Sequence, residues 1–172
     1  MMPRPAGERI HVIQGQFRVM RESGDTCLTT VLGSCVSVCL IDPLFHVGGM
    51  NHFLLPTGKT GGTNSASYGV NAMELLINGV IQAGGHRRRL RAHIFGGARM
   101  IAGLGNIGEK NAEFARDFLA REGIRIERCS TGGNSARRVT LWPATCRVEE
   151  ELIGDTIVER PGEWPGGSAE LF

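Results

Sequence analysis

A cysteine that follows a glycine–serine pair is the first residue of this chain whose surroundings suggest chemistry. Cys35 comes directly after Gly33 and Ser34, at the end of a short apolar stretch. Small residues at such a turn let a substrate approach the thiol, and they let backbone N–H groups point toward a developing oxyanion. This position is typical of a nucleophile.

A thiol nucleophile needs a base, because only the thiolate attacks. An adjacent histidine can lower a cysteine pKa from about 8.5 to roughly 3.5–7.5. His52 follows a second apolar stretch that begins at Val47. If the two stretches pair as a hairpin, the return strand carries the imidazole back beside Cys35. His52 is therefore the candidate base.

A third group should hold the imidazole in the right tautomer. A hydroxyl on the neighbouring strand, from Thr29 or Thr30, could do this less strongly than a carboxylate. Asn51 and Asp42 are rival candidates, because both lie close to His52 or to the hairpin turn. The residues alone leave the choice open.

The other cysteines are interpreted as structural. The count of five is odd, and no spacing makes a CxxC or a Cys/His zinc pattern, so free thiols in a reducing compartment are expected. Cys39 shares a strand face with Cys35 by the period of two, but it lies inside the strand. The remaining three, Cys27, Cys129 and Cys146, lack a glycine turn and a nearby histidine.

No pattern predicts a metal or a cofactor. The other histidines are not paired with carboxylates at metal-ligand spacing. Three glycine-rich stretches, at residues 95–100, 105–108 and 131–135, match neither a P-loop nor a dinucleotide fingerprint. They are interpreted as walls of a substrate groove or as tight turns.

The bulk properties exclude several classes of protein. A formal charge of +2 on 172 residues gives no case for nucleic acid or an anionic membrane as partner. The basic run at residues 86–91 is interpreted as a solvated turn between a helix and a strand rather than a docking patch. No stretch resembles a signal peptide or a membrane span, so a cytoplasmic protein is expected.

The elements that must position these residues are short. Twenty-five glycines divide the chain into segments that suit strands joined by tight turns. We expect one domain over residues 1–153 and a poorly ordered tail over 154–172. Strands are expected at 11–20, 27–32, 35–41, 47–55, 90–95, 124–129, 138–142 and 147–152, and helices at 67–83 and 109–121. This order predicts an α+β layered sandwich with helices over mixed, mostly antiparallel sheets.

Five separated motifs together resemble the CheD family. They are Leu32-Gly33-Ser34-Cys35-Val36, Gly49-Met50-Asn51-His52-Phe53-Leu54-Leu55-Pro56, Gly96-Gly97-Ala98, Asn106-Ile107-Gly108 with Asn111, and Thr131-Gly132-Gly133 with Arg137. The match runs from about residue 11 to residue 148, and both the content and the order of the motifs agree.

The resemblance implies a function and a site. CheD proteins hydrolyse the side-chain amide of particular glutamines in chemoreceptors, giving glutamate and ammonia, without a cofactor. Their Cys-His-Thr triad, carried over by position, gives Cys35 as nucleophile, His52 as base and acid, and Thr29 as the orienting hydroxyl, with Thr30 one register step away. The family fold is an α/β/β layered sandwich.

The resemblance also implies partners. The cytoplasmic helices of methyl-accepting chemoreceptors are the expected substrate, and a CheC-type phosphatase is an expected binding partner. A regulatory binding module for such a phosphatase is therefore an alternative function, and it does not exclude the first. The chemistry alone also allows a general cysteine protease or a small-molecule amidase.

Overall fold

The computed structural model describes residues 7–56, 61–100 and 106–153, with the backbone alone for 61–64. The expected tail at 154–172 lies outside the described residues. In chain order the elements are β1 (Arg9–His11), β2 (Phe17–Arg21), β3 (Cys27–Leu32), β4 (Val36–Asp42), β5 (Val47–Asn51), α1 (Gly61–Gln82), the 3-10 turn η1 (Arg87–Arg89), β6 (Arg91–Gly96), α2 (Ile107–Arg121), β7 (Arg125–Thr131), β8 (Arg137–Trp142) and β9 (Arg147–Leu152).

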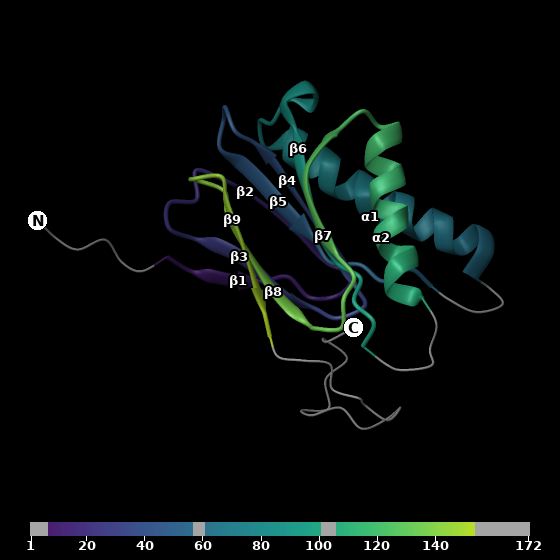
Figure 1. The fold of residues 1–172 in the computed structure, drawn as a ribbon. Helices are drawn as coiled ribbons and strands as arrows, with labels where there is room; N and C mark the ends of the chain where they lie inside the picture. The colour runs from purple at the N-terminus through teal and green to yellow at the C-terminus, as the bar shows by residue number, and fades with distance from the viewer. Residues whose placement is uncertain (1–6, 57–60, 101–105, 154–172) are drawn as a thin grey trace, which may run out of the picture.

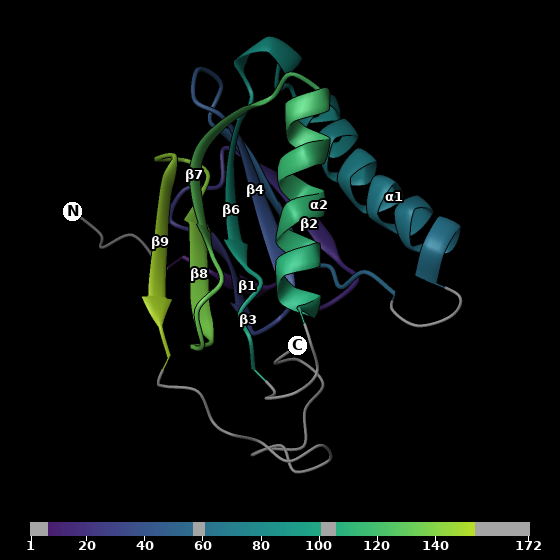
Figure 2. The ribbon, with the colours of Figure 1, turned by 45° about the vertical axis from the view of Figure 1, so that its right-hand side comes forward.

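Two sheets and a layer of helices make the fold. One sheet has four strands in the order β1-β3-β8-β9, and the other has five in the order β2-β5-β4-β6-β7. Only β1–β3 and β6–β7 are parallel pairs among the described strands. Both helices cover the face of the five-stranded sheet that points away from the other sheet (Figures 1 and 2). The expected α+β layered sandwich is confirmed.

The period of two along β4 divides the interior into two cores. Val36, Val38 and Leu40 pack under the helices. Cys39 and Ile41 belong to the second cluster, which lies between the sheets, and Cys35, one residue before the strand, joins them there. Strand side chains alternate between faces, so Cys35 and Cys39 share one face, as expected.

The helices form because their apolar residues recur on one face. Met73, Leu76, Ile77 and Val80 of α1 are all buried against the sheet. The chain leaves the helix through Gly84, whose φ of +112° suits a residue without a Cβ. The helix begins at residue 61, earlier than the apolar stripe that predicted residues 67–83.

The expected strand at residues 11–20 is wrong as a single element. The chain pairs with β3 as far as His11 and joins the other sheet from Phe17 onward. Between them lies a turn in which the Gln16 amide donates to the Ile13 carbonyl (3.0 Å). Gly15 has a φ of +88°, which breaks the extended backbone. The apolar stretch therefore crosses from one sheet to the other.

The basic run forms a turn between α1 and β6, as expected. Arg89 pairs with the buried carboxylate of Asp42 at 3.0 Å, and Asp42 also accepts from the His86 amide at 2.8 Å. Neither helix of the described part of the chain is long and apolar enough to cross a bilayer.

One glycine fixes how closely two strands approach beside Cys35. A Cβ placed on Gly96 would lie 2.2 Å from the Cys35 carbonyl oxygen, and the φ of Gly96 is +110°. Gly123 also has a positive φ, +71°, but no heavy atom would meet its Cβ within 4 Å. The two glycines differ in contact but not in the sign of φ.

We predict that Gly96→Ala lowers the free energy of unfolding by about 3–5 kcal/mol, since strain at positive φ adds to overpacking. Gly123→Ala, with strain alone, should cost about 1–2 kcal/mol. Urea denaturation of both variants measures the difference. Equal losses would show that the close approach at Gly96 contributes nothing.

Candidate active site

The pairing of β4 with the segment after β5 places Cys35 and His52 on one face. Val36 and Phe53 exchange two backbone hydrogen bonds of 3.0 and 2.9 Å. Cys35 and His52 each precede one member of this pair, so their side chains point to the opposite face and are diagonal neighbours. Such neighbours have Cα atoms about 7–8 Å apart, within reach of long side chains. The hairpin therefore places Cys35 and His52 on one face as diagonal neighbours.

His52 is held from the opposite sheet through its Nδ1 atom. Thr30 Oγ1 lies 2.8 Å from Nδ1 and 2.6 Å from the Val12 carbonyl oxygen. A carbonyl only accepts, so the single hydroxyl proton of Thr30 goes to Val12, and Oγ1 accepts from Nδ1–H. A neutral imidazole has one ring proton, so Nε2 keeps the lone pair that a base needs.

The hydroxyl at His52 belongs to Thr30, which differs from the Thr29 that the resemblance implied. Thr29 Oγ1 lies 3.1 Å from both the Val139 carbonyl and Thr140 Oγ1. The reason is the period of two along β3. Leu28 and Leu32 face the space between the sheets, and Thr30 shares their face while Thr29 points away.

The rival orienting residues lie elsewhere. Asn51 Oδ1 accepts from the Val38 amide at 2.9 Å, and its Nδ2 lies 3.6 Å from the sulfur of Met73 on α1. Its side chain is therefore under the helices, on the face opposite to that of His52. Asp42 lies at the far end of β4, bound to Arg89 and to the His86 amide.

Three successive carbonyls of the turn before β4 are bound by neighbours. The Gly33 carbonyl accepts from the Ala98 amide and the Cys35 carbonyl from the Gly97 amide, each at 2.9 Å. The Ser34 carbonyl accepts from Asn111 Nδ2 at 2.9 Å, while Asn111 Oδ1 accepts from the Leu55 amide. Asn111 is buried and ties α2 to the turn, a role that its place in the motif did not reveal.

Binding of these carbonyls directs the turn's amides. In a trans peptide the C=O and N–H point in opposite directions. The N–H groups of Ser34 and Cys35 therefore point away from Ala98 and Asn111. Neither donates to an acceptor among the described residues, whereas the Val36 amide is used by Phe53. The Ser34 and Cys35 amides are the candidate donors for an oxyanion.

The thiol is fully enclosed in this structure. Cys35 has no exposed area, and desolvation by burial raises its pKa to about 12. Cys39 is equally buried, and burial raises its pKa to about 12 as well. Burial alone therefore does not distinguish the two cysteines; only Cys35 lies at the turn and diagonal to His52.

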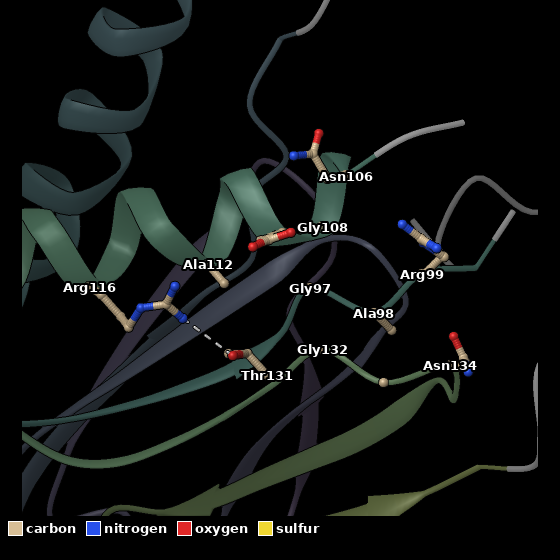
Figure 3. A pocket seen from close by; sticks show the side chains of 12 residues that line it. Gly97, Ala98, Arg99, Asn106, Gly108, Ala112, Arg116, Thr131, Gly132 and Asn134 are labelled. Carbon is tan, nitrogen blue, oxygen red and sulfur yellow. Dashed lines mark hydrogen bonds between the residues drawn. The ribbon is translucent and has the colours of Figure 1, made fainter. Parts of the chain in front are cut away.

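The glycine motifs line a hollow of about 430 Å³ behind the Cys35 turn. Figure 3 shows Gly97 and Gly132 on its floor, the start of α2 along one side, and Arg116 bonded to Thr131. Gly97 lines this hollow, and its amide donates to the Cys35 carbonyl, so the hollow lies next to the turn. The glycine pairs thus act as turns and as groove walls, while the Cys35 side chain is not part of the lining.

Comparison with known proteins identifies relatives along most of the chain. A family model described as "CheD chemotactic sensory transduction" matches residues 54–151. A protein of Rhizobium meliloti (strain 1021) is 52% identical over 158 residues, which cover 90% of this chain and 86% of that protein. An Agrobacterium fabrum protein is 49% identical over 160 residues, covering 92% and 88%.

A Caulobacter sp. (strain K31) protein is 50% identical over 147 residues, covering 84% of this chain and 78% of its own length. All three relatives are named "Probable chemoreceptor glutamine deamidase CheD". The family that the motifs indicated is confirmed by matches of this extent: the chain belongs to the CheD family.

Proposed function

We propose that this chain hydrolyses the side-chain amides of specific glutamines in methyl-accepting chemoreceptors, with Cys35 as nucleophile, His52 as base and acid, and Thr30 as the orienting hydroxyl. The observation that carries the proposal is the bond between Thr30 Oγ1 and His52 Nδ1, on the face that Cys35 shares. The names of relatives about half identical to this chain supply the substrate. We place the reaction in the cytoplasm, where the receptor helices lie.

The first step is transfer of the thiol proton to His52 Nε2, the ring atom that keeps its lone pair. The thiolate then attacks the glutamine Cδ, and the carbonyl oxygen becomes an oxyanion. The amides of Ser34 and Cys35 are free to stabilise it, and one such donor typically contributes ~3–4 kcal/mol to lowering the barrier.

The second half of the reaction uses the same histidine twice. Protonated His52 gives its proton to the leaving nitrogen, so ammonia departs and a thioester to Cys35 remains. Water then attacks the thioester, with His52 accepting its proton, and Cys35 is released with glutamate as product. Each step balances without a cofactor.

A CheC-type phosphatase is proposed as a partner on the ground of family resemblance alone. The regulatory binding module stays the alternative function. Partner affinity of Cys35→Ala separates the two, because a missing thiol stops turnover but leaves a docking surface made by other residues intact.

We predict that Cys35→Ala abolishes deamidation of a receptor fragment, whereas Cys39→Ala keeps most of it. Both thiols are buried, so the variants are matched in environment and differ in position relative to His52. Mass spectrometry detects the gain of about 1 Da per converted glutamine that amide hydrolysis requires. Circular dichroism checks the fold of both variants. Full turnover by Cys35→Ala would overturn the mechanism.

Thr30→Ala should lower kcat/KM by about 10–100-fold, because the imidazole loses the acceptor that fixes its tautomer. Thr29→Ala is the matched control and should have a smaller effect, since Thr29 bonds to β8 instead. Thr30→Ser should restore much of the rate by keeping a hydroxyl. The opposite ranking of Thr29 and Thr30 would return the orienting role to Thr29.

Chelation should not change the rate. Within the described ranges no three His, Cys, Asp or Glu side chains gather as metal ligands would. Deamidation measured before and after EDTA treatment tests this expectation. Loss of activity that added metal restores would contradict it.

A further inference from the structure

A glutamine of the chain itself lies against the Cys35 thiol. Gln14 Oε1 is 3.8 Å from Cys35 Sγ, within hydrogen-bonding distance for sulfur. The carbonyl carbon of this amide is only about 1.2 Å from Oε1. Gln14 is an exposed residue, while Cys35 has no exposed area. The Gln14 side chain therefore reaches in from the surface and ends on the buried thiol.

The segment that carries Gln14 is fastened to the site on both sides. The Gly15 amide donates to the His52 carbonyl at 2.8 Å, and the His52 amide donates to the Gln16 carbonyl at 3.1 Å. On the other side, the Val12 carbonyl accepts from Thr30 Oγ1. Gln14 thus lies between residues that bond directly to the proposed base and to its orienting threonine.

The neighbouring glutamine of the same turn behaves differently. Gln16 Oε1 accepts from the Ile13 amide at 3.3 Å, so this side chain folds back on its own segment. The contact with the thiol is therefore specific to Gln14 and is not a general result of glutamines in this turn.

The group at the thiol is the same chemical group that the proposed reaction consumes. We propose that the Gln14 carboxamide is an internal ligand of the subsite that receives the receptor's glutamine amide. This inference rests on the proposed function, and it identifies the subsite as the space beside Cys35 Sγ under residues 12–16. Substrate binding is then an exchange, in which a receptor glutamine displaces Gln14 before the thiol can react.

Such an exchange has a defined kinetic consequence. If Gln14 occupies the subsite in most free enzyme molecules, the apparent affinity for substrate falls by the fraction of molecules that are open. An internal competitor acts on the free enzyme alone, so its removal should lower KM and leave kcat unchanged. The enclosed thiol also has a pKa raised to about 12 by burial, which keeps it protonated while the subsite is filled.

The test measures access to the thiol and needs no receptor. Gln14→Ala and Gln16→Ala are treated with methyl methanethiolsulfonate, a small neutral thiol reagent, and the modification of Cys35 is followed over time by mass spectrometry with fragment spectra. The exposed thiol of Cys129 in the same molecule reports the activity of the reagent. We expect Cys35 to react about tenfold faster in Gln14→Ala than in wild type, and at the wild-type rate in Gln16→Ala.

Adding a free amide to Gln14→Ala distinguishes a subsite that binds amides from a turn that the substitution has merely loosened. Acetamide matches the group that Gln14→Ala removes, so it should slow the modification of Cys35 in that variant, while acetate should not. An unchanged rate in Gln14→Ala, equal acceleration in both variants, or equal effects of acetamide and acetate would each overturn the inference.

The same variants separate this inference from the proposed function. If wild type deamidates a receptor fragment but Gln14→Ala shows no fall in KM, the internal ligand is refuted and the deamidase stands. If no protein turns over any receptor fragment while the thiol results hold, the proposed function fails and the occupied subsite remains.

Discussion

The hydrogen bond between Thr30 and His52 is the interaction on which the rest of the site depends. Its two residues come from different sheets, and both are almost fully buried. Because Thr30 gives its proton to Val12, the bond sets the ring proton of His52 on Nδ1 and leaves Nε2 as the base. The sandwich thus serves chiefly to bring a hydroxyl from one layer to an imidazole from the other.

A second constraint acts on the backbone before β4. The carbonyls of Gly33, Ser34 and Cys35 are all bound by Gly97, Ala98 and Asn111, so the turn cannot rotate without losing several buried hydrogen bonds. This rigidity holds the Ser34 and Cys35 amides away from these partners, and it leaves them as the candidate donors to an oxyanion. Gly96 obeys the same constraint, because a Cβ at this position would lie 2.2 Å from the Cys35 carbonyl oxygen.

Much of this arrangement could be predicted from the sequence because it depends on local pattern. The bounds of β3 and the hairpin that carries Cys35 and His52 follow from apolar runs and turn residues. The choice between Thr29 and Thr30 could not be made in this way, because it depends on which face of β3 meets the other sheet. Leu28 and Leu32 could have indicated this face. Both are apolar, and Thr30 lies two residues from each of them, so the three side chains share one face of β3.

The crossing of residues 12–16 between the sheets could not be predicted from the sequence either. Its turn is held by backbone bonds of Gly15 and Gln16 to His52, a residue on a distant segment of the chain. The contacts of Gln14 and the Val12 carbonyl with the site follow from that crossing. The same limit applies to Asn111, whose partners Ser34 and Leu55 lie on distant segments. Such long-range partners depend on how the strands and helices are arranged in space. The periodicity of apolar residues along the sequence does not predict this arrangement.

The hydrogen bond that places the His52 ring proton on Nδ1 can be tested directly by the ¹⁵N chemical shifts of the His52 ring, assigned by comparison with His52→Gln. We predict that in the neutral ring Nδ1 is protonated and Nε2 is not. A neutral ring protonated on Nε2 would contradict it, because His52 could not then accept the Cys35 proton.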